Sequence, residues 1–190
     1  MNDDNGRSGG YGGDGDGDGD NDLMQKSIEG DQSSFEELVI RHMDNAIFFA
    51  KRYVLDIYVA EEVVQESFAD IYVNIERYRA NYSFKTYLYT IIKNKCIDYI
   101  RKNTRLDTYQ HVEQEDMSAE EIALNKERWS IFGKAFGKLK SEYKTVIYLY
   151  AYEEFSYEEI SKIMGKNMGQ IKILLYRARQ SLKNRIEEEG

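Results

Sequence analysis

Residues 156–186, SYEEISKIMGKNMGQIKILLYRARQSLKNRI, predict two short helices joined by a tight turn. Ser156 and Glu159 form a capping-box pattern, which marks the start of the first helix. Gly165 marks its end, because the residue after a helix often adopts a left-handed backbone that glycine tolerates. A second helix is expected from about Met168.

The apolar residues of this second helix recur three or four positions apart, so they share one face. They are Ile171, Leu174, Leu175, Ala178, Leu182 and Ile186. From Lys162 to Arg185 there are seven basic residues and no acidic one. A short helix, a turn and a basic second helix are typical of a helix-turn-helix DNA reader. An ordinary helical hairpin with a solvated basic face is the alternative that these residues leave open.

The composition favours a helical protein of one or two small domains. The chain has 190 residues, 42% hydrophobic and 13% aromatic, and no proline. Its single cysteine, Cys96, excludes an internal disulfide and fits a reducing compartment. There is no apolar run of the roughly 18 residues that a membrane span needs and no apolar signal-peptide core. We therefore expect a soluble, cytoplasmic protein without membrane insertion.

The net charge of −8 is unevenly distributed. Residues 1–22 hold seven aspartates and one arginine, a net of −6, which leaves −2 for the other 168 residues. This Gly/Asp-rich stretch is expected to be a disordered acidic tail. Residues 77–105, in contrast, have eight basic residues and one acidic residue. The chain thus contains two basic segments that could contact nucleic acid despite its acidic total.

Three helices are predicted before this first basic segment. They cover residues 23–29, a longer stretch to residue 55 that begins near Ser33 or Ser34, and residues 59–76. The last of them, VAEEVVQESFADIYVNIE, has one apolar face and one acidic face. The acidic face comprises Glu61, Glu62, Gln65, Glu66 and Asp70. Such a face is either solvated or a docking surface for a basic partner.

Residues 77–83, RYRANYS, predict a basic loop, after which Ser83 can cap a helix that runs to about residue 102. Its inward-facing residues should be Phe84, Leu88, Ile91, Ile92, Cys96 and Tyr99. Tyr87, Asn94 and Arg101 are seven positions apart and share the opposite face. An aromatic ring, an amide and a guanidinium on one stripe could bind a single-stranded base. Packing of Tyr87 against a neighbouring helix is an equally good interpretation.

The predicted fold class is all-α, with two small helical domains joined by a flexible linker. Residues 1–22 are the acidic tail, 23–102 the first domain, 103–120 the linker and 121–187 the helix-turn-helix domain. Helices at residues 121–140 and 142–152 should support the helix-turn-helix, with Trp129 in its core. The two distant histidines, the single cysteine and the lack of a glycine-rich phosphate loop argue against an enzyme. We expect no catalytic residue, no metal site and no cofactor.

Two segments of the chain resemble a known family. Residues 60–102, AEEVVQESFADIYVNIERYRANYSFKTYLYTIIKNKCIDYIRK, resemble the second conserved region of bacterial sigma factors, and residues 156–183 resemble their fourth region. The short linker without an intermediate domain is similar to the extracytoplasmic-function (ECF) group of the sigma-70 family. The resemblance implies a subunit that binds core RNA polymerase, reads the promoter −10 and −35 elements and helps to open the −10 region.

The same resemblance assigns roles to residues. Contacts with the polymerase clamp are implied for Glu62, Gln65, Glu66 and Asp70. Contacts with the −10 element are implied for Arg79, Asn81, Tyr82, Ser83, Tyr87, Asn94, Asp98 and Arg101. Contacts with the −35 element are implied for Gln170, Lys172, Ile173, Tyr176, Arg177 and Arg179. Expected partners are core polymerase, through its clamp and its flap, promoter DNA and an anti-sigma factor.

Some positions depart from the family pattern. Tyr87 occupies a position where the family usually has tryptophan, and the turn before the last helix lacks the frequent proline. Ile173 and Leu174 replace the common serine and arginine, which bears on the promoter sequence that is read. The alternative function is a helix-turn-helix regulator that binds duplex DNA independently of polymerase. The acidic face and the Tyr87 stripe distinguish the two functions, because such a regulator needs neither.

Overall fold

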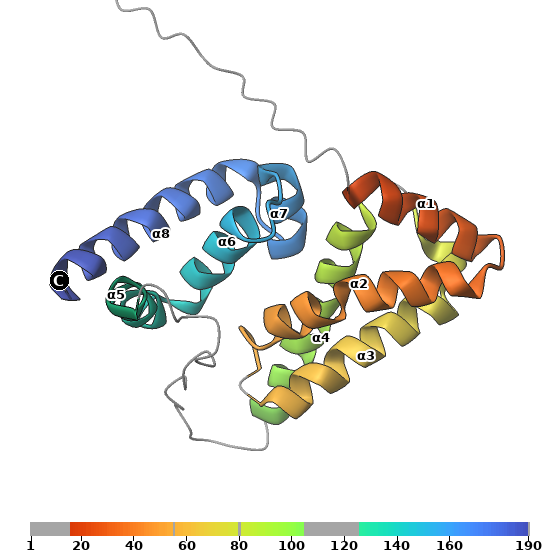
Figure 1. Cartoon of the computed structure of the whole chain (residues 1–190), viewed down its shortest axis with the longest axis horizontal. Helices are drawn as coiled ribbons and strands as arrows, with labels where there is room; N and C mark the ends of the chain where they lie inside the picture. Colours follow the sequence, from red (N-terminus) through yellow and green to blue (C-terminus); the bar gives the residue numbers. More distant parts are fainter. Residues whose placement is uncertain (1–15, 55, 80, 105–125, 190) are drawn as a thin grey trace, which may run out of the picture.

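The computed structural model describes residues 16–54, 56–79, 81–104 and 126–189, in which the regular structure is entirely helical (Figure 1). This confirms the all-α prediction for the described residues. No described helix is long and apolar enough to cross a membrane. The helices are α1 (Asp16–Ile28), α2 (Gln32–Ala50), α3 (Ile57–Val73), the 3-10 turn η1 (Ile75–Arg77), α4 (Phe84–Thr104), α5 (Lys126–Gly137), α6 (Ser141–Ala151), α7 (Tyr157–Met164) and α8 (Met168–Glu189).

Helices α1 to α4 form the first domain. Helix α2 packs against α1, α3 and α4, so that it lies at the centre of this group. Its buried residues recur at helical spacing and include Phe35, Leu38 and Phe49. Leu88 and Ile92 of α4 meet them in the core and are fully buried. Burial of this apolar stripe, more than helix propensity, holds the domain together.

The predicted extent of the acidic tail is wrong at its C-terminal end. Helix α1 begins at Asp16, not after residue 22, and Asp20 is buried. The Asp20 carboxylate lies 2.5 Å from Nε2 of His42 and 3.3 Å from the Arg41 guanidinium. These two partners from α2 offset the desolvation of the aspartate. The rest of the predicted tail, residues 1–15, lies outside the described residues.

Two further details of the first domain differ from the predictions. The cap of α2 is Asp31 and neither Ser33 nor Ser34, since the Asp31 carboxylate accepts the backbone N–H of Ser33 at 3.0 Å. In α4, Tyr99 is 36% exposed, whereas Tyr89 is fully buried and was not expected to be. Tyr89 is buried because α4 is covered by helices on two sides.

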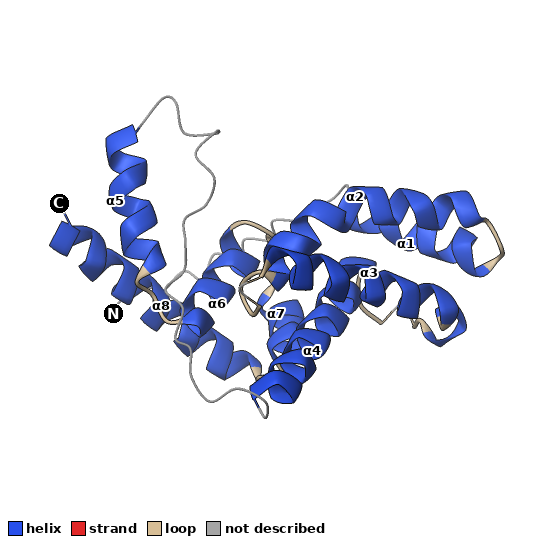
Figure 2. Cartoon of the chain, turned by 90° about the horizontal axis from the view of Figure 1, so that it is seen from below, coloured by secondary structure: helices blue, strands red, loops and turns tan. Residues whose placement is uncertain are grey.

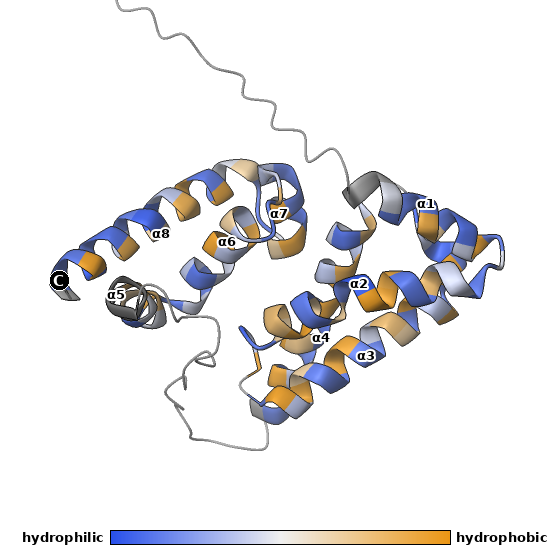
Figure 3. Ribbon diagram, in the orientation of Figure 1, coloured by the Kyte–Doolittle hydropathy of each residue, from blue (hydrophilic) through white to orange (hydrophobic). Residues whose placement is uncertain are grey.

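Helices α5 to α8 form the second domain, in which the predicted helix-turn-helix is confirmed. Ser156 and Glu159 make the reciprocal bonds of a capping box at the start of α7. Gly165 ends α7 with a φ of 66°, in the left-handed region. Figure 3 shows alternating apolar and polar residues along α8. The expected linker falls almost wholly on residues 105–125, and these residues, together with the Trp129 side chain, lie outside the described part of the chain.

The two domains pack directly against each other through α4 and α7 (Figure 2). Their apolar residues form one continuous buried cluster rather than two separate cores. Arg52, just after α2, lies across the rings of Phe48 and Tyr148, with its Cζ 4.4 Å and 3.8 Å from the two ring centroids. The side chain of Tyr148 belongs to α6, so this cation–π contact also joins the domains.

Candidate nucleic-acid and protein interfaces

The predicted docking face lies on α3 and is exposed. Val63, Val64 and Ser67 are buried, which turns the acidic residues of α3 outward. Glu62, Gln65, Glu66 and Asp70 are all exposed. Lys95 of α4 partly neutralises this face, because its Nζ lies 2.6 Å from Asp70 and 3.4 Å from Glu66.

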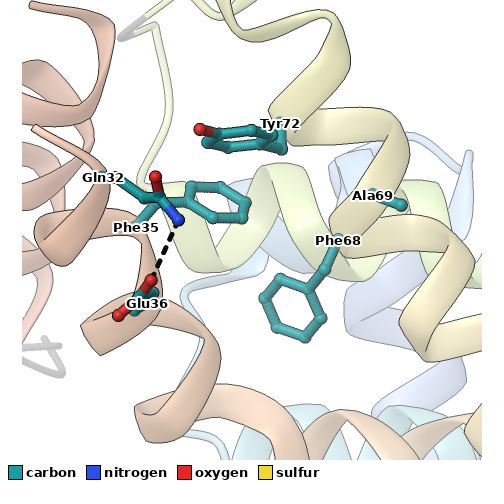
Figure 4. Close-up of a pocket in the computed structure, with 6 residues that line it drawn as sticks. All are labelled: Gln32, Phe35, Glu36, Phe68, Ala69 and Tyr72. Carbon is teal, nitrogen blue, oxygen red and sulfur yellow. Dashed lines mark hydrogen bonds between the residues drawn. The ribbon is translucent and has the colours of Figure 1, made fainter. Parts of the chain in front are cut away.

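A shallow groove of about 260 Å³ lies between α2 and α3 (Figure 4). Its lining is mostly apolar and consists of Gln32, Phe35, Glu36, Phe68, Ala69 and Tyr72. The rings of Phe35 and Tyr72 are 5.0 Å apart. Tyr72 is 45% exposed, so apolar surface lies beside the acidic face. The groove could not be predicted from the sequence, because its two walls come from different helices.

The predicted −10 loop follows η1. Arg79 and Asn81 are exposed, as a contact with DNA requires. The Arg79 guanidinium donates to the carbonyl oxygens of Glu76 at 2.7 Å and Tyr78 at 3.0 Å. These bonds shape the loop from within and leave the outer face of the loop accessible.

Tyr82 and Ser83 are not freely exposed, because α7 of the second domain covers them. The Ser83 hydroxyl donates to Glu159 at 3.0 Å, and the Thr86 hydroxyl donates to the same oxygen at 2.8 Å. Lys162 lies over the Tyr82 ring, with its Nζ 4.6 Å from the centroid. The interface between the domains therefore occupies part of the predicted −10 surface.

Ser83 also caps α4, as predicted, since its Oγ accepts the backbone N–H of Thr86 at 3.3 Å. Tyr87 is half-buried and packs edge-on against Tyr78, with the ring centroids 5.4 Å apart. Its packing partner belongs to the loop of the same domain.

The remaining −10 candidates, Asn94, Asp98 and Arg101, are exposed along α4. Arg101 forms a loose ion pair with Asp98 at 3.6 Å. They extend the polar face of α4 beyond the α7 contact.

The six predicted −35 residues are all exposed on α8, and five of them fall into two groups. Ile173 is 53% exposed, Tyr176 is 65% exposed, and Arg177 is exposed beside them. Lys172 and Arg179 instead lie over a stacked tyrosine pair, Tyr157 and Tyr150, at 5.8 Å and 4.8 Å from the ring centroids. Ile173, Tyr176 and Arg177 thus form the part of α8 that is best placed to reach a groove.

Gln170 has a structural role in addition to its predicted one. Its Oε1 accepts the backbone N–H of Asn167 at 2.9 Å, and Asn167 Oδ1 accepts the backbone N–H of Gln170 at 2.9 Å. This reciprocal cap starts α8 without a proline in the turn. The amide oxygen that would accept a hydrogen bond from adenine is therefore used within the protein.

Charged residues are buried between the domains. Glu153 is 5% exposed, and its carboxylate lies 2.7 Å from Nζ of Lys85 in α4. Burial raises the pKa of the Glu159 carboxyl, but hydrogen bonds from Ser156, Thr86 and Ser83 outweigh burial and lower this pKa below its ordinary value. Glu159 thus stays ionised at neutral pH. Neither contact can be predicted from the sequence, because the partners are far apart along the chain.

The described residues contain no group of three or more His, Cys, Asp or Glu side chains that could hold a metal ion. His42 has a structural role, because it is buried against Asp20. The surfaces that remain as candidates are the face of α3, the loop with α4, and the exposed side of α8.

Comparisons with known proteins agree with this division. The family Sigma-70 region 2 matches residues 27–106, and the family Sigma-70, region 4 matches residues 130–182. The ECF RNA polymerase sigma factor SigW of Bacillus subtilis is 28% identical over 173 residues, which cover 84% of this chain and 92% of SigW. The ECF RNA polymerase sigma-E factor of Haemophilus influenzae is 29% identical over 180 residues, covering 87% of this chain and 94% of that protein.

Among solved structures, the fold is similar to that of the sigma factor RpoE from Bartonella quintana, crystallised with the anti-sigma factor NepR. The TM-score is 0.64 at 23% identity, over 80% of this chain and 96% of that chain. CnrH, solved with the cytosolic domain of CnrY, has a TM-score of 0.65 at 21% identity, over 90% and 99% of the two chains. The chain therefore belongs to the sigma-70 family, in its ECF group, and is a sigma factor that directs promoter-specific transcription initiation.

Proposed function

We propose that the chain binds core RNA polymerase through α3, reads the −10 element with the loop and α4, and reads the −35 element with α8. The observation that carries this proposal is the presence of three exposed surfaces of different chemistry on one chain. A regulator that binds only duplex DNA would need α8 alone.

The acidic face of α3 supports docking on a basic partner. Glu62, Glu66 and Asp70 project from the same side of α3, because they are four positions apart, and Val63, Val64 and Ser67 are buried on the other side. The groove lined by Tyr72 adds apolar surface, and burial of this surface by a partner would stabilise the complex. An acidic patch next to apolar anchors is suited to a protein partner with the opposite charge.

The loop and α4 support capture of a −10 base. Arg79, Asn81 and Asn94 are exposed donors and acceptors, and Tyr87 supplies an aromatic ring at the start of α4. Extraction of a base from duplex DNA costs a few kcal/mol, which stacking and hydrogen bonds must offset. In this structure α7 covers Tyr82 and Ser83. Contact between DNA and the complete −10 surface therefore requires α7 to move away from α4.

The exposed side of α8 supports reading of the −35 element in the major groove. Arg177 can donate to a guanine edge or to phosphate, and Ile173 can contact a thymine methyl group. Leu174 is half-buried against the core rather than exposed, in line with its departure from the usual arginine. We expect the preferred −35 sequence to reflect the departures from the family pattern at Ile173 and Leu174.

The test is transcription by bacterial core polymerase on a pool of promoter sequences, with and without the chain. Specific start sites that appear only with the chain would support the proposal, and the selected templates would give both elements. Binding to duplex DNA without binding to core polymerase would instead favour the independent regulator.

We also infer a protein inhibitor and a cytoplasmic site of action. The sigma factor RpoE of Bartonella quintana was solved in complex with the anti-sigma factor NepR, and CnrH was solved with the cytosolic domain of CnrY. Co-purification of the chain from its host, followed by a transcription assay of the captured protein, would test this. A captured protein that leaves transcription unchanged would not be such an inhibitor.

A further inference from the structure

We propose that Asn21 is a positioning residue for promoter opening: its side-chain oxygen holds the loop between η1 and α4 in the shape that receives the −10 base. The proposal rests on the proposed function of this loop. Asn21 lies in the Gly/Asp-rich segment at the start of the chain, and it is not among the site residues predicted from the sequence. Its role follows from two hydrogen bonds.

Asn21 joins both ends of the loop. Its Oδ1 accepts the hydroxyl of Tyr78 at 2.9 Å, where the loop begins, and the backbone N–H of Phe84 at 3.1 Å, where α4 begins. The partners are 57 and 63 positions away along the chain. One amide oxygen therefore sets the separation between the two ends.

The same contact caps α4. The first N–H groups of a helix have no partner within the helix. Ser83 satisfies that of Thr86, and Asn21 satisfies that of Phe84. Without Asn21, the first turn of α4, which carries the Tyr87 ring, would lose one of its two side-chain caps.

Tyr78 transmits the position of Asn21 to the proposed base-binding residues. Its ring packs edge-on against Tyr87 at 5.4 Å, and its hydroxyl also lies 3.2 Å from the carbonyl oxygen of Tyr82. Burial, with the nearby Asp20 carboxylate, raises the pKa of Tyr78 to about 12. The hydroxyl is thus protonated at neutral pH and can donate to Asn21.

Asn21 is itself held in place by its neighbour. Asp20 is buried and bonded to His42 of α2, and the His42 ring packs against Phe84, with the centroids 5.6 Å apart. This anchors α1 beside the start of α4. All these contacts lie within the first domain, so they remain available when α7 moves away from the loop.

The experiment measures promoter opening by core polymerase with the full chain, on a promoter that the wild-type chain selects. Permanganate reactivity of −10 thymines gives the opening rate on duplex DNA. The variants are Asn21→Ala, Tyr78→Phe and their combination. Asn21→Asp retains the acceptor, and Asp22→Asn is a control at an exposed position of the same helix.

We expect Asn21→Ala to slow opening at least about fivefold, the minimum that the loss of two ordinary hydrogen bonds implies. The effects of Asn21→Ala and Tyr78→Phe should be less than additive in the double variant, because both changes break the bond between Tyr78 and Asn21. Asn21→Asp and Asp22→Asn should open close to the wild-type rate. On a promoter whose −10 region is already unpaired, the rate with Asn21→Ala should be closer to the wild-type rate than it is on duplex DNA.

Several outcomes would overturn the proposal. These are opening at the wild-type rate by Asn21→Ala, additive effects in the double variant, or a parallel loss of core-polymerase affinity, which would show a purely structural role. If the wild-type chain itself yields no specific starts, the proposed function fails and not this inference.

Discussion

At the scale of single residues, Arg177 is an exposed cation on the side of α8 that points away from the core. We expect Arg177→Ala to weaken binding of the −35 element by about 1–3 kcal/mol, because a good contact with a base edge is worth that much. Lys134→Ala removes the same charge from an exposed position of α5 and is the control. The measurement is holoenzyme binding to −35 duplex at matched salt; equal losses in both variants would reduce the effect to general electrostatics.

Glu62 is the exposed residue of α3 that tests docking most cleanly, because Glu66 and Asp70 are paired with Lys95. Glu62→Lys should weaken the affinity for core polymerase at least tenfold, since it places like charge against a basic partner. Asp44→Lys, exposed on α2 between buried residues, makes the same change of charge away from α3 and should have little effect. Titration of labelled chain with core polymerase measures both, and equal affinities would remove the acidic face from the interface.

At the scale of elements, the turn between α7 and α8 depends on a glycine. Gly165 has a φ of 66°, where a side chain costs about 1–2 kcal/mol. Gly165→Ala should lower the free energy of unfolding by about that amount. Gly133→Ala, within α5 and with open space around the added Cβ, should leave it unchanged or raise it by up to about 1 kcal/mol. Urea unfolding of the two variants checks this, and a similar sign in both would contradict the backbone argument.

At the scale of the whole molecule, the α4–α7 contact holds the domains together over the loop. Thr86→Val removes a hydroxyl bonded to Glu159 and should open the contact, because a hydrogen bond to a charged group is worth about 1.5–3 kcal/mol. Thr90→Val makes the same change one turn later, where the hydroxyl donates to its own helix. Small-angle scattering of the free chain should show a larger radius of gyration for Thr86→Val only. Equal radii would show that this bond does not hold the domains.

The same contact should depend on pH. The folded pKa of Glu159 is lowered, so its contribution to the contact is fully present above the ordinary glutamate pKa of 4.5 and is lost as the pH falls through the lowered value. The cations at this interface are Lys85, paired with Glu153, and Lys162, which lies over Tyr82. Scattering of the wild-type chain should therefore show expansion below the ordinary glutamate pKa, whereas Thr86→Val should already be expanded at neutral pH. Expansion at the same pH in both would assign the transition to another group.

Features set by neighbours along the chain could be predicted from the sequence. The capping box of Ser156 and Glu159, the left-handed Gly165 and the apolar stripe of α8 depend on residues three or four positions apart. Such interactions form within one helix or turn, so a pattern in the sequence is enough to specify them. Together with the exposed acidic face of α3, they specified the all-α class and the surfaces that serve the proposed function.

Contacts between distant segments were decided only by the tertiary structure. Asp20 and Asn21 belong to a stretch whose composition predicts disorder, yet they are ordered because they bind partners from α2 and α4. Tyr89 is buried between Phe49 of α2 and Phe155 just before α7, and Glu159 meets a hydroxyl 73 positions away. Local propensity carries no information about such pairs, since their energy appears only when the packed helices exclude water around them.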